Sequence, residues 1–292
     1  LHLSIRRQRQ MCIRDRYGGK RLNDNQERLA NEFAGQGWSV DHIDQASLEV
    51  IDNQLTGSDR GGVRHILDRF DRVWVVGFGD QATFLDRMQL LRTLDQSRFV
   101  NNIDALIYLH GKPHLILGGL GQHHPRTIVS AHVPTLLGPI EGGGSWIGKP
   151  TAGSFGRDVF SLSKNDRNRR AILEHLTRSG FAMLQQQVDT TDEKRFLIAG
   201  SHLIGVYGKH HIDHRSNLTA GSAPTVVEAS PAETKLVTTC IRWLNKQGVR
   251  FAAIDIAYPY VLDVNIANPG WLATYEEMTG CNFADKVVEA LT

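Results

Sequence analysis

The sequence Phe251-Ala-Ala-Ile-Asp-Ile-Ala-Tyr-Pro-Tyr-Val-Leu-Asp-Val-Asn265 contains two apolar runs that are separated by Tyr258-Pro259. Two such runs on either side of a turn dipeptide predict a β-hairpin. Because side chains alternate along a strand, Asp263 and Asn265 are expected on the same face of the sheet. A turn centred on the proline places Asp255 opposite Asp263. The hairpin is therefore predicted to gather two carboxylates and one amide on one face.

These polar side chains need a counter-charge, because two facing carboxylates are costly to bury in an apolar sheet. A hard cation would supply that charge, and Mg²⁺ prefers one or two carboxylates together with phosphate oxygens. The hairpin thus favours a magnesium site formed by Asp255, Asp263 and Asn265. The alternative is an ordinary hairpin whose polar residues lie at its rim.

The composition is typical of a soluble globular protein, with 41% hydrophobic and 22% charged residues. A chain of 292 residues is long enough for one large domain or for two to three small ones. It contains no apolar run of about 18 residues, so no transmembrane helix is expected. The three cysteines, Cys12, Cys240 and Cys281, lie far apart. This spacing indicates a reducing compartment, and we expect a cytoplasmic protein without disulfides.

The first sixteen residues differ from the rest of the chain, because they carry five arginines and one aspartate. Without them the chain has 28 basic and 30 acidic residues, a net charge of −2, which does not indicate nucleic-acid binding. They lack the apolar core of a signal peptide. A basic targeting or nucleic-acid arm is one interpretation. We favour non-native sequence, since the stretch resembles translated adapter sequence, and expect residues 1–16 to be dispensable for the stability of the C-terminal two-thirds of the chain.

Helix-like and strand-like patterns alternate in the first third of the chain, which predicts an α/β layer structure with a parallel sheet. The predicted helices are Leu22–Phe33, Val63–Phe70 and Phe84–Leu94, and the predicted strands are Trp38–Ile43 and the buried run Arg72–Gly77. Gly77-Phe-Gly79 follows a predicted strand but lacks the third glycine of a dinucleotide fingerprint. Nicotinamide binding is therefore not expected.

A lysine and a glycine-rich loop follow each other in the middle of the chain. Lys149 lies near the end of a predicted apolar strand, and the next loop contains Gly153 and Gly156. Glycines let backbone N–H groups approach an anion, and a lysine binds phosphate as a point charge. The lysine precedes the glycines, so this is not a Walker loop. The alternative is a surface hairpin whose lysine extends to water.

Polar residues are concentrated between Lys209 and Gly221. The stretch Lys209-His-His-Ile-Asp-His-Arg215 has the residue types of a transition-metal site. Adjacent histidines on a strand would point apart, however, so a polar loop near a ligand is the preferred interpretation. The following residues, Ser216 to Gly221, are polar and end in a glycine, which is typical of an active-site loop.

Ser230-Pro-Ala-Glu233 has the pattern of a capping box with proline at the first helical position. It predicts a helix that continues to Lys246 and ends near Gly248. The apolar stripe of this helix includes Cys240, which we interpret as a core residue. A closing helix is predicted over Phe283–Leu291.

The order of these motifs resembles the ATP-grasp superfamily, and in particular bacterial glutathione synthetase and the ribosomal-protein glutamate ligases of the RimK type. The most specific match is Arg215-Ser-Asn217-Leu-x-x-Gly221, which resembles the family's Arg-[Gly/Ser]-Asn-Leu-x-x-Gly loop. The second is Asp255, followed by Asp263 and then by Asn265-Ile-Ala-Asn-Pro-Gly270. The resemblance covers residues 17–292.

This resemblance implies an α/β chain, α+β in its C-terminal part, with the ATP-grasp fold. It also implies the following organisation: a non-native arm (1–16), a Rossmann-like pre-ATP-grasp domain (17–108), a small lid subdomain (109–188) and a C-terminal subdomain (189–292).

The resemblance further implies a role for each matching residue. Those that would bind ATP are Lys112 and Lys149 at the phosphates, Gly153 and Gly156 in the covering loop, Gln185, Gln186, Gln187 and Val188 in the adenine hinge, and Glu193 at the ribose. Those implied to be catalytic are Arg195, Lys209, Arg215 and Asn217. Asp255, Asp263 and Asn265 would bind Mg²⁺, with Mn²⁺ as the alternative ion. The family usually has Glu at the position of Asp263 and Asp at that of Glu193, a difference of one methylene in reach.

The implied activity is that of an ATP-dependent carboxylate–amine ligase. A substrate carboxylate attacks the γ-phosphate of ATP, and an amine then attacks the acyl phosphate. The protein positions the reactants and neutralises charge, so no covalent enzyme nucleophile is expected. The implied partners are a small-molecule acid and a small-molecule amine, with no nucleic acid and no membrane; a homo-oligomer is left open.

Two alternatives belong to other functional classes. The first is a nucleotide-binding ATP-grasp protein without ligase turnover, since the synapsins use this fold. The presence of Arg195, Arg215 and Asn217 favours the enzyme over this alternative. The second is a histidine–metal hydrolase, which rests only on residues 210–214.

Overall fold

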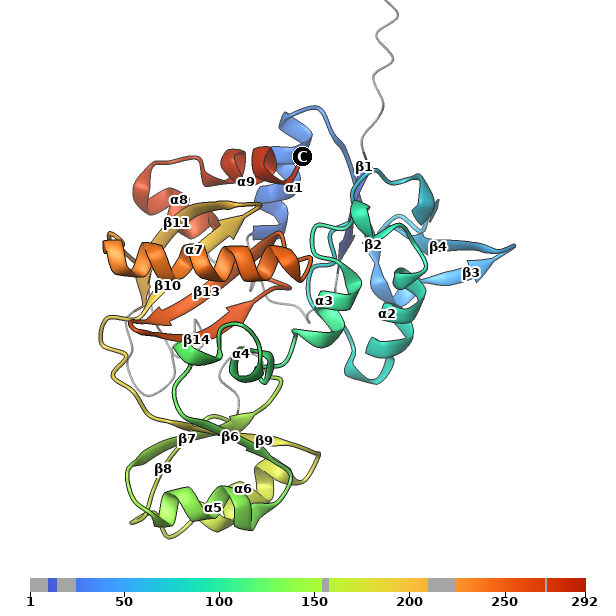
Figure 1. The fold of residues 1–292 in the computed structure, drawn as a ribbon. Helices are drawn as coiled ribbons and strands as arrows, with labels where there is room; N and C mark the ends of the chain where they lie inside the picture. The colour runs from blue at the N-terminus through green and yellow to red at the C-terminus, as the bar shows by residue number, and fades with distance from the viewer. Residues whose placement is uncertain (1–9, 15–24, 154–157, 210–223, 271) are drawn as a thin grey trace, which may run out of the picture.

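The computed structural model describes residues 10–14, 25–153, 158–209, 224–270 and 272–292 (Figure 1). The helices are α1 (Asn25–Gly35), α2 (Phe84–Arg92), α3 (Ile103–Tyr108), α4 (His114–Leu117), α5 (Val133–Glu141), α6 (Arg169–Thr177), α7 (Pro231–Lys246), α8 (Leu272–Thr279) and α9 (Phe283–Leu291). The strands are β1 (Gln10–Arg14), β2 (Ser39–Asp44), β3 (Glu49–Ile51), β4 (Gln54–Ser58), β5 (Arg64–Ile66), β6 (Thr127–Ser130), β7 (Ser145–Pro150), β8 (Phe160–Ser163), β9 (Ala182–Gln186), β10 (Lys194–Ala199), β11 (His202–Lys209), β12 (Pro224–Val226), β13 (Phe251–Ala257) and β14 (Tyr260–Asn265).

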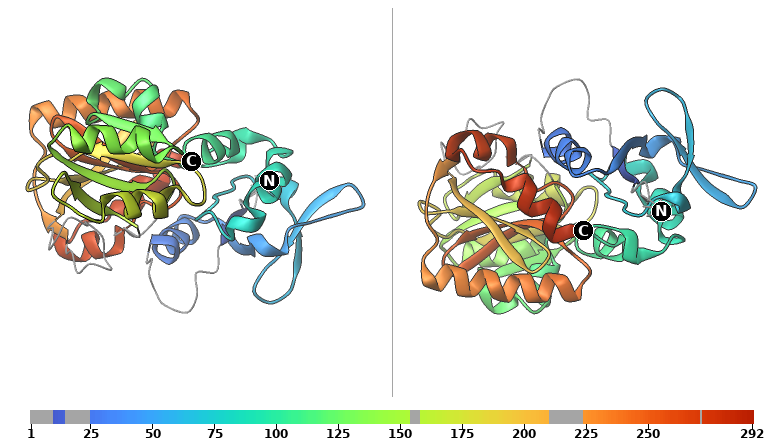
Figure 2. Two further views of the ribbon diagram at one scale, coloured as in Figure 1. Left: turned by 90° about the horizontal axis from the view of Figure 1, so that it is seen from below. Right: turned by 90° about the horizontal axis from the view of Figure 1, so that it is seen from above.

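A five-stranded antiparallel sheet, in the order β12-β11-β10-β13-β14, forms the centre of the C-terminal part. Its side chains alternate between two faces, as the period of a strand requires. Phe196 and Ile198 belong to the core cluster that α7 covers. Leu197 and Ala199 belong to the cluster that contains α9. Figure 2 shows α7 and α9 on opposite sides of this sheet.

The predicted β-hairpin is confirmed. β13 and β14 pair in antiparallel orientation, and Asp255 lies opposite Asp263 in the register. The turn between them contains Tyr258-Pro259, whose peptide bond is cis. The register shifts after Asp255, so that Leu262 has no counterpart on β13. The hairpin therefore brings the two carboxylates to the same edge of the sheet, as the sequence predicts.

The predicted capping box also forms, at the start of α7. The Ser230 hydroxyl accepts a hydrogen bond from the backbone N–H of Glu233 at 3.2 Å, and the Glu233 carboxylate accepts one from the Ser230 N–H at 2.7 Å. Cys240 lies fully buried on the same helix. Burial raises the pKa of its thiol to about 12, so Cys240 is an unreactive core residue.

A smaller four-stranded antiparallel sheet, in the order β6-β9-β7-β8, carries α5 and α6 on one side (Figure 1). Its own core contains Trp146 and Leu184 from the strands, Leu136 and Ile140 from α5, and Leu173 from α6. This core is separate from the two clusters that flank the larger sheet. The small sheet therefore packs as a unit of its own.

The N-terminal part differs from the sequence-based expectation at one helix. The predicted helix Val63–Phe70 is wrong, because residues 64–66 form β5 and residues 67–69 a single 3-10 turn. The Asp59 side chain accepts hydrogen bonds from the N–H groups of Gly61 and Val63, and this tight turn folds the chain back against β4. The apolar spacing of this segment fits a helix, but the turn before it determines a strand.

The predicted strand Arg72–Gly77 forms only in part. Val73 to Val76 are buried as expected, and Val73 pairs with Phe99 in an isolated parallel bridge, but the segment forms no continuous strand among the described residues. β1 and β2 also pair in parallel, whereas β3, β4 and β5 form an antiparallel sheet. The Rossmann-like description of this part stays a prediction. Within the described residues, no helix has both the length and the apolar character that crossing a bilayer requires.

Candidate active site

Strand alternation turns Lys194 and Arg195 to opposite faces of the larger sheet. The Lys194 ammonium lies 3.0 Å from the Glu233 carboxylate on the α7 side. Nε and Nη2 of Arg195 each donate to a different oxygen of Asp255 at 2.6 Å, and its Nη1 donates to the Pro269 carbonyl at 3.0 Å. This two-point pairing is the strongest form of an arginine–carboxylate contact. It fixes the guanidinium of Arg195 at the centre of the candidate site.

Lys209 completes a buried group of charges around Asp255. Its ammonium lies 3.1 Å from Oδ2 of Asp255 and also contacts the Glu193 carboxylate. Asp255, Glu193 and Lys209 are 3%, 4% and 5% exposed. Burial opposes ionisation of Asp255, but the charges of Arg195 and Lys209 outweigh it and hold the pKa of this carboxyl well below its usual range. Asp255 is therefore an anion at any working pH.

A second ion pair lies beside the first, between Lys112 and Asp263. The Lys112 ammonium is 2.6 Å from Oδ2 of Asp263. Burial raises the pKa of Asp263, but the Lys112 charge outweighs it and lowers that pKa below its usual value. The backbone N–H of Lys112 donates to the Thr151 carbonyl at 2.8 Å. This bond holds the Lys112 loop against the end of β7, where Lys149 lies.

Lys149 differs from the other cations because it lacks an acidic partner among the described residues. Its ammonium donates to Oε1 of Gln185 at 2.9 Å, and the described residues offer it no other hydrogen-bond acceptor. Burial, together with the charge of Lys112, lowers the pKa of Lys149 to about 8. At neutral pH the side chain is therefore a half-buried cation whose remaining N–H groups are available to an anion.

The remaining predicted nucleotide residues form no common cluster in the described structure. Gln186 and Gln187 are exposed and Val188 is half-buried. A Cβ built on Gly153 would meet only Pro150, at 3.8 Å, so crowding does not require glycine there. Gly156, Arg215, Asn217 and the histidines of residues 210–214 lie outside the described residues.

The hairpin of β13 and β14 offers a set of donor atoms to a metal ion. Asp255, Asp263 and Asn265 supply oxygen atoms, which are the ligands that Mg²⁺ prefers, and the buried side-chain nitrogen of Asn265 has no hydrogen-bond partner among the described residues. Both carboxylates already pair with side-chain cations. Lys112, Arg195 and Lys209 therefore provide the positive charge that was expected from a metal ion. The described residues contain no group of three His, Cys, Asp or Glu placed to hold a metal. The donor set fits Mg²⁺, and the site stays a prediction.

One residue of this region carried no signal in the sequence. His124, which lies between α4 and β6, is buried and contacts both Gln185 and the Val261 carbonyl. A histidine in a His-His-Pro loop has no periodicity or spacing that marks it. Its contacts arise only when the two sheets come together.

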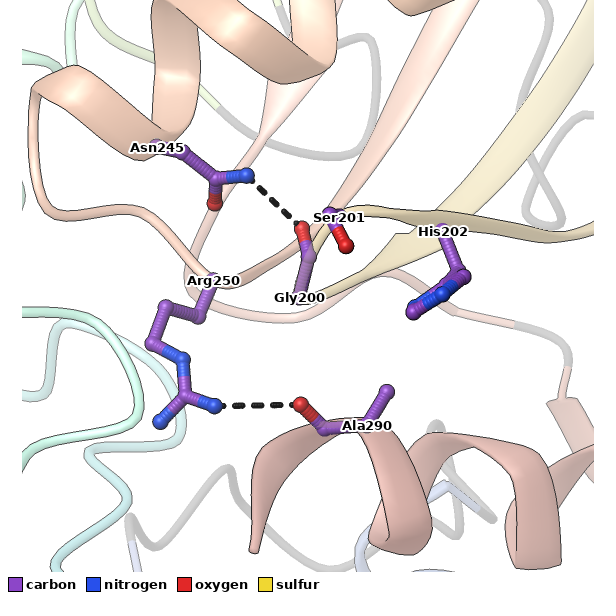
Figure 3. A pocket seen from close by; sticks show the side chains of 6 residues that line it. All are labelled: Gly200, Ser201, His202, Asn245, Arg250 and Ala290. Atoms are coloured by element: carbon purple, nitrogen blue, oxygen red, sulfur yellow. Dashed lines mark hydrogen bonds between the residues drawn. The ribbon is translucent and has the colours of Figure 1, made fainter.

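A surface pocket with a volume of about 380 Å³ lies away from these residues (Figure 3). It is lined by Gly200, Ser201, His202, Asn245, Arg250 and Ala290. Figure 3 shows that Asn245 donates to the Gly200 carbonyl and Arg250 to the Ala290 carbonyl. Gly200 follows the end of β10 that is remote from Arg195. None of the predicted site residues lines this pocket.

Comparison with known proteins identifies relatives of this chain. The model of the family described as "Prokaryotic glutathione synthetase, ATP-grasp domain" matches residues 114–280, more than half of the chain. Glutathione synthetase of Nostoc sp. is 26% identical over 171 residues, and that of Prochlorococcus marinus is 27% identical over 183 residues. These matches cover 56% and 60% of this chain, and 53% and 60% of the relatives. The chain thus spans between half and two thirds of the curated relatives that it matches.

Solved structures show the fold. D-cycloserine synthetase DcsG superimposes with a TM-score of 0.73 at 15% identity, over 97% of this chain and 99% of that chain. A RimK domain protein ATP-grasp from Sphaerobacter thermophilus superimposes with a TM-score of 0.66 at 18% identity, over 96% and 98% of the two chains. These similarities confirm the predicted ATP-grasp fold and the predicted resemblance to glutathione synthetase and RimK. The chain belongs to the family of prokaryotic glutathione synthetase ATP-grasp domains.

Proposed function

We propose that this protein is an ATP-dependent carboxylate–amine ligase that activates its acid substrate as an acyl phosphate. The observation that carries the proposal is Lys149, a half-buried ammonium group that has no carboxylate partner among the described residues. A cation that is partly removed from water without a counter-ion is costly, so its presence favours an anionic ligand. The phosphates of ATP would supply that charge.

The charge balance of the candidate site supports an anionic ligand. The cations are Lys112, Lys149, Arg195 and Lys209, and the carboxylates are Glu193, Asp255 and Asp263. Among the described residues of the site, four positive and three negative charges leave a net charge of +1 before any ligand binds. A site of this sign attracts a polyphosphate, and a partly buried environment strengthens the attraction.

In the proposed reaction, a carboxylate oxygen of the substrate forms a bond to the γ-phosphorus while the bond to the β-phosphate oxygen breaks, and ADP leaves. The amine then attacks the acyl carbon, inorganic phosphate leaves, and the amine nitrogen loses a proton. Lys149 and Lys112 would neutralise charge on the transferring phosphate, and Arg195 would hold the acid or the acyl phosphate. Positioning and charge stabilisation of this kind account for most of the catalysis in phosphoryl transfer.

Asp255, Asp263 and Asn265 are the residues that would hold Mg²⁺, and the ion would supply positive charge against the phosphates. Lys112, which now pairs with Asp263, would then be free to contact a phosphate. The hairpin of β13 and β14 supports this role because it presents all three side chains from one face.

The relatives that carry the name glutathione synthetase favour a substrate of amino-acid or peptide type. We therefore propose an amino acid or a γ-glutamyl peptide as the acid, and a small amine as the acceptor.

Hydroxylamine replaces the amine in a direct test of the proposal. ATP-dependent hydroxamate formation with one member of a panel of such acids is the expected result. Measurable ATP binding without hydroxamate or ADP across the whole panel would contradict the proposal and support nucleotide binding without turnover.

A further inference from the structure

A chain of hydrogen bonds connects the small sheet to the hairpin through His124. Lys149 on β7 donates to Oε1 of Gln185 on β9 at 2.9 Å. Nε2 of Gln185 lies 2.8 Å from Nε2 of His124, and Nδ1 of His124 lies 2.8 Å from the Val261 carbonyl on β14. His124 is 8% exposed and Gln185 is 5% exposed. The chain is therefore shielded from water along most of its length.

The donors and acceptors of this chain are fully determined by Lys149. An ammonium group only donates, so the Gln185 amide must turn its oxygen toward Lys149 and its NH₂ group toward His124. Nε2 of His124 must then accept, which places the imidazole proton on Nδ1. That proton is donated to the carbonyl of Val261, on the edge strand of the larger sheet. If the imidazole were protonated, its Nε2–H would face the NH₂ group of Gln185, and two donors would lie opposite each other.

The electrostatic surroundings agree with a neutral imidazole. Burial lowers the pKa of His124 to about 4, and the charges of Lys149 and Lys112 also lower it. The hydrogen bond to Val261 and the charge of Asp263 act in the opposite direction and are outweighed. His124 is therefore uncharged near neutral pH, and its Nε2 lone pair faces Gln185.

We infer that His124 is a positioning residue for Lys149: it fixes the orientation of the Gln185 amide, and thereby keeps the amide oxygen on the Lys149 ammonium group. Without the Nε2 acceptor, the Gln185 amide is free to turn and to present NH₂ to the ammonium group. The bond to Val261 adds a second effect, because it holds the lysine at a set place relative to β14 and Asp263. This inference rests on the proposed function, in which Lys149 contacts a phosphate of ATP.

The first test needs no nucleotide. In protein labelled with ¹⁵N-histidine, the ¹⁵N shifts of His124 are expected to show a protonated Nδ1 and a bare Nε2 from about pH 6 to about pH 8. The signal is assigned by its loss in His124→Phe. The Cε resonance of Lys149, assigned through Lys149→Arg, should titrate with a different midpoint in His124→Phe. A protonated Nε2, or an unchanged Lys149 midpoint, would overturn the inference.

The second test is the affinity for ATP with Mg²⁺, measured by calorimetry. His124→Phe should weaken binding roughly threefold to tenfold, the range for one lost hydrogen bond. His124→Gln, whose amide oxygen can accept from Gln185, should restore most of the affinity. His123→Phe is the matched control, because the His123 side chain hydrogen-bonds only to its neighbour Gln122 among the described residues, and this variant should bind ATP like the wild type.

The outcomes separate the two proposals. If His124→Phe bound ATP like the wild type while Lys149→Ala did not, the role of His124 would be wrong and the phosphate role of Lys149 would stand. If the wild-type protein bound no ATP, the proposed function would fall, and the tautomer and the Lys149 titration would still decide whether His124 orients Gln185. Circular dichroism of each variant shows whether the fold is kept.

Discussion

Arg195 and Asp255 face each other across β10 and β13, and two nitrogens of the guanidinium each lie 2.6 Å from a different carboxylate oxygen. The Asp255 side chain is 4% exposed and that of Arg195 is 17% exposed, and Lys209 shares one of the two carboxylate oxygens. Lys209 also pairs with Glu193, so the two cations and the two carboxylates balance in charge. The pair fixes the position of the Arg195 guanidinium, which the proposed function uses.

Replacing Arg195 with alanine should abolish hydroxamate formation and lower the free energy of unfolding by about 3 kcal/mol, because a buried carboxylate loses a partner. Lys194→Ala is the matched control, since it breaks the buried pair with Glu233 on the opposite face of the same strand. Its stability loss should be similar, but its turnover should remain. Equal loss of turnover in both variants would mean that Arg195 acts only through stability.

Lys149→Ala should weaken ATP binding by about 2 kcal/mol, roughly thirtyfold, which is the usual effect of losing one charge-assisted contact. The fold should be kept, because removing a half-buried cation that has no acidic partner among the described residues also removes a desolvation cost. Calorimetry measures the affinity, and Lys164→Ala, at an exposed position, serves as the control. Unchanged affinity in Lys149→Ala would argue against the phosphate role.

The affinity for ATP should depend on pH through Lys149, whose pKa burial lowers to about 8. As the pH rises through this value, the ammonium group loses its proton and its attraction for phosphate, so binding should weaken between about pH 7.5 and about pH 9.5. Below that window the charge is present and affinity should be level. Lys149→Arg, which stays charged, should flatten the profile. The same slope in both proteins would assign the titration to another group.

The depressed pKa of Lys149 also has a consequence for folding. Between about pH 8 and its ordinary value, the unfolded chain binds more protons at this residue than the folded chain does. The contribution of Lys149 to the free energy of unfolding should therefore rise with pH across this range. Comparing urea denaturation of wild type and Lys149→Met at both ends of the window measures the difference.

Asp263→Ala and Asn265→Ala should each cause a severe loss of turnover at saturating Mg²⁺, because both side chains point from the same face opposite Asp255. Asp263→Glu should keep activity, since the family usually has Glu at this position. Activity of each variant is followed as ADP release over a Mg²⁺ titration. Near-normal turnover in either alanine variant would show that the hairpin does not hold the metal.

The local elements of the fold could be predicted because their causes are local. The alternation around Pro259 determines the hairpin and its register, and the Ser230 capping box determines where α7 begins. The helix predicted over Val63–Phe70 does not form, and the cause is again local. Its apolar spacing is compatible with a helix, but the Asp59 side chain bonds two backbone N–H groups and turns the chain into a strand.

The sequence could propose residues for the site but not their contacts. The family resemblance implies Lys112 and Arg195, and local motifs also indicate Lys149 and Asp255; their roles stay predictions. Their partners do not, because the ion pair of Lys112 with Asp263 joins residues from distant parts of the sequence. His124 was missed altogether, since only the approach of the two sheets gives it a role.

The bond between the Lys112 N–H and the Thr151 carbonyl couples two lysines that lie far apart in the sequence. Thr151 directly follows β7, so this bond joins the loop that carries Lys112 to the strand that carries Lys149. The same loop also lies against the larger sheet, because Leu115 belongs to the core beneath α7 and His114 stacks on Trp243 of that helix. A rotation of the small sheet would therefore stretch the bond between Lys112 and Thr151 and change the spacing of the two ammonium groups.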